Sequence, residues 1–158
     1  MDEYLQAAFE EARRSQHEGG FPVGSVIVHD GKVIGRGRNR VTQSGDPINH
    51  AEIEAIRNAT AKTDDRPLTD SLQGATCYTT MMPCEMCAGA IIRFGIRKVV
   101  VAELTSYTDA GTAPFLEKQG ITVEVLNNEI CIELVQAYFS QHPQQAELMR
   151  EKRRRLRL

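Results

Sequence analysis

Long apolar stretches and a secretion signal are both missing from this 158-residue sequence. No apolar run approaches the roughly 18–20 residues that cross a bilayer, which argues against a transmembrane helix. The N-terminal segment MDEYLQAAFEEARR is acidic and amphipathic, whereas a signal peptide starts basic and continues apolar. We therefore expect a cytoplasmic protein that has no membrane partner.

Cysteine is scarce as well, with four residues at positions 77, 84, 87 and 131. Thiols stay reduced in the cytosol, so we interpret these residues as metal ligands or core residues before disulfides. Gly35 and Gly37 do not belong to a G-x-G-x-x-G segment that opens a helix, which argues against a dinucleotide-binding site. The composition, with 41% hydrophobic and 25% charged residues, is ordinary for one globular domain.

Positive charge is concentrated at the C-terminus. Residues 150–158 contain six basic residues and one acidic residue, a net charge of +5. Because the whole chain has a net charge of −2, the first 149 residues carry −7. A nucleic-acid-binding domain usually has a basic face on its body, so we do not expect nucleic acid as a partner. The basic tail itself has two open interpretations, a solvated helix end or a segment that contacts RNA or an interface.

Apolar periodicity and turn residues predict alternating strands and helices. Asp30-Gly31 lies between two β-branched runs and indicates a hairpin turn, while Pro83 fits the first turn of a helix. Residues 41–47 are rich in turn formers and are predicted as a loop. The expected helices cover residues 2–18, 50–61, 83–94, 113–119 and 128–140, and the expected strands cover 22–30, 32–39, 75–80, 96–103 and 121–126.

This alternation indicates an α/β fold with three layers, α/β/α, around a five-stranded mixed sheet. The first two strands are expected to form an antiparallel hairpin, and the later strands to pair in parallel. We find no internal repeat, linker or second domain. Residues 1–158 are therefore expected to form a single domain that ends in the basic tail 150–158.

The segment NHAEIEAI at residues 49–56 places His50 and Glu52 two positions apart in an apolar stretch at a predicted helix start. Two titratable groups in such a position cost stability unless they are paired, hydrogen-bonded or bound to something. Further along the chain, Cys84 and Cys87 in the segment PCEMC lie three positions apart at the start of another predicted helix. Their side chains therefore project from one face of that helix.

One imidazole and two thiolates form a donor set that suits zinc and leaves one tetrahedral position for water. The exposed N–H groups at a helix N-terminus also favour the thiolate form that binds metal. Cys77 lies in the middle of a predicted strand, and Cys131 has no partner at C-x-x-C spacing. We interpret both as core residues rather than as a fourth ligand, which favours a catalytic over a structural zinc site.

Glu52 adds a carboxylate close to this set. A carboxylate that is not itself a ligand can carry a proton during zinc-dependent hydrolysis. His50-x-Glu52 followed by Pro83-Cys84-x-x-Cys87 matches the known signature of zinc deaminases. Either half alone is weak evidence, but both halves in this order, each at a predicted helix start, are specific.

On these motifs the chain resembles the cytidine deaminase-like superfamily, and within it the single-domain nucleobase and tRNA deaminases. The segments PVGSVIV, GRGRN, HAEIEAI, YTTMMPCEMCAGAII and VVVAE follow the order of that family across most of residues 22–103. The resemblance implies that His50, Cys84 and Cys87 hold one Zn²⁺ per chain and that Glu52 shuttles the proton.

The resemblance also implies substrate contacts and a quaternary state. Asn39, at the end of GRGRN, matches an asparagine that hydrogen-bonds the substrate. The backbone of Ala51 and the carbonyl of Met82 would face the reacting ring, and Tyr107 would stack on it. The family further implies a homodimer whose subunits help to close each other's pockets.

Three relatives within this superfamily imply different substrates. Fungal-type cytosine deaminase is similar through the C-terminal third of the chain, which favours deamination of free cytosine to uracil and a role in pyrimidine salvage. Bacterial guanine deaminase, similar over residues 39–59, and tRNA adenosine deaminase, similar at HAEIEAI and PCEMCAGA, remain alternatives. Cytosine deaminases end with a tryptophan and an acidic residue that close over the base. This chain has no tryptophan and has Ala146 and Met149 at the matching positions, with Glu147 as a substitute for the acid.

Overall fold

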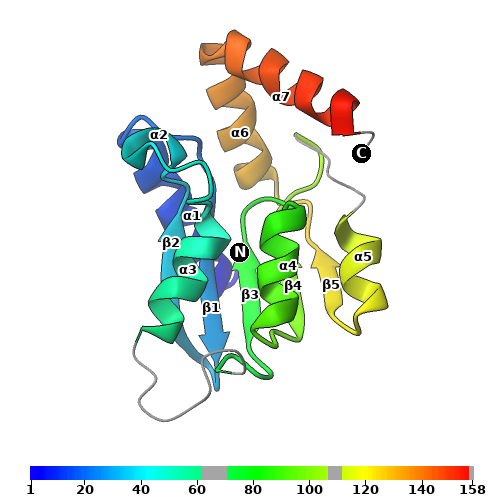
Figure 1. The fold of residues 1–158 in the computed structure, drawn as a ribbon. Helices are drawn as coiled ribbons and strands as arrows, with labels where there is room; N and C mark the ends of the chain where they lie inside the picture. The colour runs from blue at the N-terminus through cyan, green and yellow to red at the C-terminus, as the bar shows by residue number, and fades with distance from the viewer. Residues whose placement is uncertain (62–70, 107–111, 157–158) are drawn as a thin grey trace.

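The computed structural model describes residues 1–61, 71–106 and 112–156. They contain a five-stranded sheet with the strand order β2-β1-β3-β4-β5 (Figure 1). β1 pairs antiparallel with both β2 and β3, whereas β3, β4 and β5 run parallel. The strands are β1 (Gly24–His29), β2 (Lys32–Arg38), β3 (Thr76–Thr79), β4 (Lys98–Val101) and β5 (Thr122–Val125). The predicted mixed sheet is confirmed.

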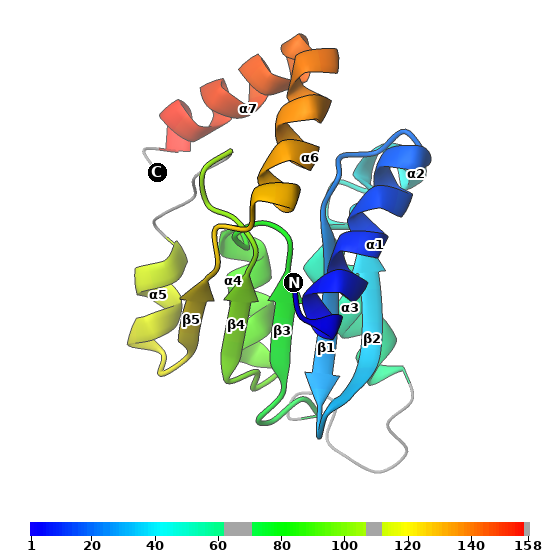
Figure 2. The ribbon, with the colours of Figure 1, turned by 180° about the vertical axis from the view of Figure 1, so that it is seen from behind.

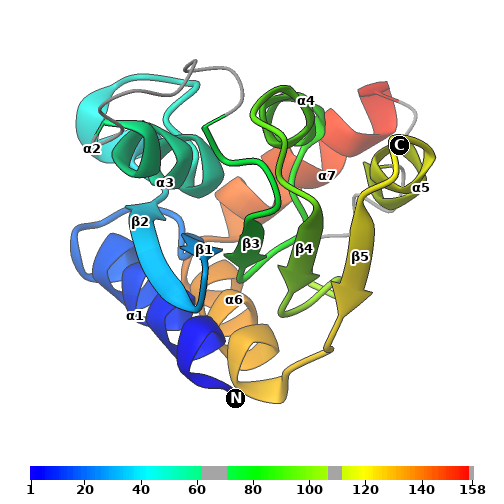
Figure 3. The same ribbon diagram turned by 90° about the horizontal axis from the view of Figure 1, so that it is seen from below.

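Helices cover both faces of the sheet, which gives the three-layer α/β/α fold that the sequence predicts (Figure 3). One face carries α3 (Ala51–Thr60), α4 (Glu85–Arg93) and α5 (Thr112–Lys118). The other face carries α1 (Glu3–His17) and α6 (Glu129–Gln141), which lie in front of the sheet in Figure 2. The short helix α2 (Val41–Ser44) precedes α3, and α7 (Pro143–Leu156) crosses the top of the molecule in Figure 1.

Local sequence explains where several elements begin. Asp30 and Gly31 form the hairpin turn with φ angles of 50° and 69°, the left-handed values that a tight two-residue turn requires. Asp2 caps α1 by accepting a hydrogen bond of 2.7 Å from the first turn. Asn128 caps α6 in the same way at 3.3 Å.

The largest apolar core lies between the sheet and the layer of α3, α4 and α5. Alternate strand residues point into it, and they include the fully buried Cys77. Cys131 is buried on the other face, against Leu5 of α1 and Ala102. Both cysteines are therefore core residues, as predicted.

Glycines allow helices to pack unusually close to the hairpin. A Cβ at Gly35 or Gly37 in β2 would collide with the backbone of α3, and a Cβ at Gly24 in β1 would collide with the backbone of α1. The GRGRN segment therefore determines how closely α3 can approach the sheet. This matters because α3 begins immediately after His50.

Some local predictions were wrong. Residues 41–44 form a helical turn instead of a loop. Cys84 is the N-cap of α4, so Pro83 precedes that helix rather than lying in its first turn. Met86, an apolar residue of α4, is 36% exposed because Cys87 and Ile91 take the inner face of that helix. Residues 150–156 of the basic tail belong to the 14-residue helix α7, whose start at Pro143 the sequence analysis missed.

Within the three described ranges, no helix combines the length and the apolar character needed to cross a membrane.

Candidate metal centre and pocket

The N-termini of α3 and α4 lie at the same end of the sheet, where β3 and β4 end (Figure 1). His50 is the N-cap residue of α3 and Cys84 is the N-cap residue of α4. Both have extended backbone angles, and neither side chain caps its own helix with a hydrogen bond. Two positive helix ends therefore face one cluster of donors, which stabilises negative charge there.

The donor atoms of His50, Cys84 and Cys87 have the spacing of a zinc tetrahedron. The two sulfurs lie 3.7 Å apart, and each lies 3.6 Å from His50 Nδ1. Tetrahedral zinc, with bonds of about 2.3 Å to sulfur and about 2.0 Å to nitrogen, needs about 3.8 Å between the sulfurs and about 3.5 Å from each sulfur to the nitrogen. No other cluster of three His, Cys, Asp or Glu donors occurs in residues 1–61, 71–106 and 112–156. These residues therefore fit zinc.

The four cysteines differ in acidity. The Cys87 thiol, at hydrogen-bond distance, lowers the pKa of Cys84 to about 4, and His50 acts in the same direction. The contact with Cys84 and burial raise the pKa of Cys87, so the pair carries its negative charge on Cys84. Burial raises the pKa of Cys77 and of Cys131 to about 12. Only the clustered pair therefore supplies a thiolate readily.

Neither core cysteine joins the cluster. Cys77 Sγ lies 3.3 Å from the hydroxyl of Ser25, and Cys131 packs beneath α1. The cluster in the described part of the chain thus has three protein donors. Three donors leave one tetrahedral position for water, which distinguishes catalytic from structural zinc sites.

Glu52 lies in the first turn of α3 with 3% of its surface exposed. Its Oε1 accepts a hydrogen bond of 3.1 Å from the hydroxyl of Thr79 at the end of β3. Burial, followed by the charge of the Cys84 thiolate, raises the pKa of Glu52. A buried carboxyl with a raised pKa beside a metal cluster is typical of catalytic sites.

A pocket of about 310 Å³ opens beside this centre. Its walls come from the segments around β1 and β2, from the starts of α3 and α4, and from α7. The apolar wall residues are Phe21, Val23, Val41, Met81, Met82 and Met149, and the polar ones are Asn39, Thr42, His50, Glu52, Cys84 and Gln145. The pocket thus combines an apolar slot with a few convergent polar groups, as ligand sites usually do.

Not all of the predicted substrate-contact residues line the pocket. Asn39 and Met82 line the pocket, and Asn39 Oδ1 accepts a hydrogen bond of 3.3 Å from the Val41 N–H. Ala51 is fully buried and is not among the residues that line the pocket. Tyr107 lies outside the described residues.

Sequence reasoning missed Phe21 and Gln145. The Phe21 ring lies 5.2 Å from the Tyr138 ring of α6, centroid to centroid, and also lines the pocket. An aromatic residue placed between a helix-ending glycine pair and a proline was the available signal for Phe21. No signal in the sequence indicated Gln145, because its position depends on where α7 crosses the molecule. Glu147, the suggested substitute acid, pairs with Arg150 at 3.4 Å and does not line the pocket.

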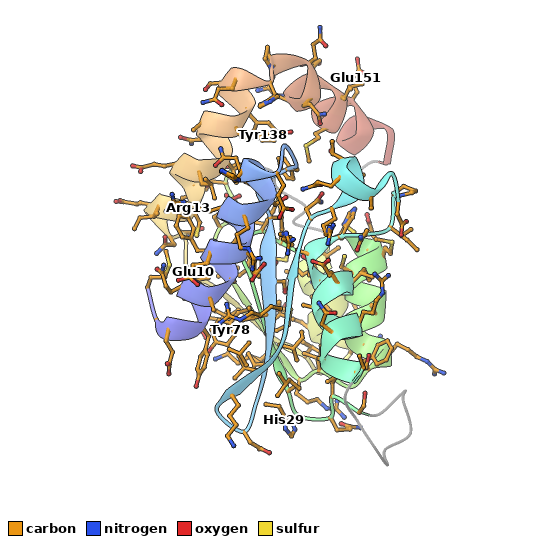
Figure 4. The ribbon with its side chains drawn as sticks, turned by 90° about the vertical axis from the view of Figure 1, so that its left-hand side faces the viewer. Glu10, Arg13, His29, Tyr78, Tyr138 and Glu151 are labelled. Carbon is orange, nitrogen blue, oxygen red and sulfur yellow. The ribbon has the colours of Figure 1, made fainter. Side chains whose placement is uncertain are left out.

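The other histidines lie away from the centre. His17 and His142 are exposed. His29 is half-buried, and its Nε2 lies 3.1 Å from the Gln73 carbonyl. Figure 4 shows His29 at the hairpin end of the sheet and Glu151 at the opposite end, on α7.

Comparison with known proteins agrees with this geometry. The sequence model of the cytidine and deoxycytidylate deaminase zinc-binding region matches residues 1–103. The chain is 36% identical to cytosine deaminase of Candida albicans over 141 residues, 89% of each chain. It is 32% identical to the tRNA-specific adenosine deaminase of Buchnera aphidicola over 145 residues, 86% of this chain and 91% of that protein. A solved guanine deaminase of Nitrosomonas europaea superposes with a TM-score of 0.76 at 28% identity, covering 87% of this chain and 83% of that chain.

Proposed function

Since the chain belongs to the family of the cytidine and deoxycytidylate deaminase zinc-binding region, and is a zinc-dependent hydrolytic deaminase, we propose that it deaminates a free nucleobase, with cytosine as the first candidate. The observation that carries this proposal is the pocket. Among its described lining residues none is Lys or Arg, and six are apolar. A phosphate would be left without a charged partner there, whereas a planar ring fits the apolar walls.

His50, Cys84 and Cys87 hold the zinc in this proposal. Zinc with an open coordination position supplies a Lewis acid that makes water nucleophilic near neutral pH. The two helix N-termini keep Cys84 as a thiolate and place all three donors without rearrangement.

Glu52 carries the protons of the reaction. It takes a proton from the attacking water and gives it to the ring nitrogen next to the amino-bearing carbon. A second proton passes through Glu52 to the amino group as the carbon–nitrogen bond breaks. A carbon–oxygen bond has formed, ammonia leaves, and a carbonyl remains. Burial of Glu52 raises its pKa, which suits a group that both accepts and returns a proton.

The remaining pocket residues orient the ring. Asn39 uses its amide nitrogen as a donor to a ring carbonyl, because its oxygen already accepts from the Val41 N–H. Phe21 and Met82 provide apolar contact to the ring. Gln145 offers an amide from α7, near where cytosine deaminases are expected to have their closing residues.

A second candidate is tRNA adenosine deamination. Met149 lines the pocket, and the six basic residues of the tail 150–158 follow it in the sequence. The tRNA deaminase relatives match nearly as much of the chain as cytosine deaminase does. Guanine deaminase is the third candidate, supported by the structural likeness.

The test is an ammonia-release screen of the zinc-loaded protein with cytosine, guanine, adenine, their nucleosides and a tRNA anticodon stem-loop at one salt concentration. The expected result is the highest kcat/KM for cytosine. A variant truncated after Met149 is the control, because it keeps Gln145 and Met149 and removes the basic tail. Its cytosine turnover should change less than about threefold, because basic residues that contact phosphates strengthen the binding of a nucleic acid and not that of a free base. A stem-loop that reacts a hundredfold better than cytosine refutes the proposal.

We also propose that the chain forms a homodimer through the layer of α4 and α5. Both helices lie on the same side of the sheet (Figure 3). Met86 of α4 is 36% exposed and Phe115 of α5 is 44% exposed. Large apolar side chains on one face are typical of subunit interfaces. Light scattering after size exclusion should give twice the 17.6 kDa chain mass, and Phe115→Glu should shift it towards the monomer.

A further inference from the structure

Thr79 ends β3 with its hydroxyl between the carboxylate of Glu52 and a backbone carbonyl. Its side chain is fully buried. Thr79 Oγ1 lies 3.1 Å from Glu52 Oε1 and also 3.1 Å from the carbonyl oxygen of Met81. Thr79 neither lines the pocket nor belongs to the donor cluster. Any effect it has on the reaction must therefore pass through Glu52 or through Met81, which lines the pocket, and the orientation of the Glu52 carboxylate distinguishes the two.

A hydroxyl has one hydrogen to donate and can accept another hydrogen bond. The two neighbours of Thr79, the Glu52 carboxylate and the Met81 carbonyl, are both acceptors, and a carboxylate is the stronger one. The Thr79 hydroxyl therefore directs its hydrogen to Glu52 Oε1, while the Met81 carbonyl keeps the hydroxyl in place from the other side.

We propose that Thr79 is a positioning residue that holds the Glu52 carboxylate in the orientation it needs for proton transfer. This inference rests on the proposed role of Glu52 as the proton carrier. Valine has nearly the same shape as threonine but offers no hydrogen bond, so Thr79→Val leaves the carboxylate without this partner. Serine retains the hydroxyl and should retain the function.

Thr80 provides a matched control one residue further along the chain. It is 1% exposed, and its Oγ1 accepts a hydrogen bond of 3.1 Å from the Gly24 N–H. Its hydroxyl thus serves the backbone of β1 instead of Glu52. Thr79→Val and Thr80→Val each remove one buried hydroxyl, so a purely structural effect should appear in both variants.

The kinetic test compares the zinc-loaded wild type with Thr79→Val, Thr79→Ser and Thr80→Val, using the base with the highest kcat/KM in the screen. Thr79→Val should lower kcat by about 10- to 100-fold, the range for a lost hydrogen bond to a charged group. KM should change less than about threefold, and zinc content and the unfolding midpoint should match those of Thr80→Val. Thr79→Ser should recover most of kcat, and Thr80→Val should keep it. Equal losses of kcat in both valine variants, or no recovery with serine, overturn the proposal.

Crystal structures of the zinc-loaded wild type and Thr79→Val give a readout that does not depend on turnover. The Glu52 carboxylate should have one orientation in the wild type and a different one, or two, in the valine variant. An unchanged carboxylate overturns the positioning role. If the wild type deaminates none of the substrates, the proposed function fails, while the two structures still decide this inference.

Discussion

Replacing Gly37 with alanine should displace α3 from the sheet. A Cβ at this position of β2 would collide with the Ala51 carbonyl oxygen and the Ala55 nitrogen, and would lie 2.9 Å from the carbonyl carbon of Glu54. Comfortable contacts between such atoms are about 3.5–4.0 Å, so α3 must move by roughly 1–2 Å. All three atoms belong to the helix backbone, so rotating a side chain cannot relieve the collision.

The displacement should affect both stability and catalysis. Overpacking of this kind costs about 1–3 kcal/mol, which lowers Tm by about 2–12 °C for a chain of this length. α3 carries Glu52 in its first turn and starts directly after His50. A shift of about 1 Å in groups that must be aligned with the substrate can cost about 100-fold in turnover.

Thermal unfolding by circular dichroism, zinc content per chain and ammonia release measure the three consequences of Gly37→Ala. Gly89→Ala is the control, because a Cβ at that exposed position of α4 has no atom within 4 Å. Alanine there should raise helix stability by up to about 1 kcal/mol. If Gly37→Ala keeps the wild-type Tm and turnover, α3 does not need this close approach and the reasoning is refuted.

Three further predictions concern the centre itself. Wild-type protein should carry about one zinc per chain, and Cys84→Ala should lose most of it in metal analysis after dialysis, whereas full retention would disprove the ligand assignment. Glu52→Gln should keep zinc and fold but lose roughly 10²- to 10⁴-fold in turnover, and a near wild-type rate would mean that another group carries the proton. In zinc-free protein the pKa of Cys84, about 4, lies below both pH 6 and pH 8, so iodoacetamide should label it equally fast at both. An ordinary thiol would react roughly 75-fold more slowly at pH 6 than at pH 8. Mass spectrometry should find Cys77 and Cys131 unlabelled because their pKa values are about 12.

Much of the fold could be predicted because it depends on residues that are close in the chain. The Asp30-Gly31 turn, the β-branched run in β1 and the helical period in α1 follow from short-range stereochemistry. The same holds for part of the centre. Cys84 and Cys87 lie on one face of their helix wherever that helix sits in the fold, and His50 and Glu52 are likewise neighbours along the chain. The chemistry of these residues was therefore predictable before their arrangement.

The sequence by itself thus determined the donor types, their helix-start positions and the layered α/β fold. Only the tertiary structure decided that His50 lies 3.6 Å from two sulfurs more than 30 positions away, because that distance depends on how α3 and α4 pack on the sheet. It also decided that Gln145 of α7 faces the pocket and that Thr79 contacts Glu52. Such contacts join residues far apart in the chain, and no local pattern encodes them, because they arise from the packing of complete elements.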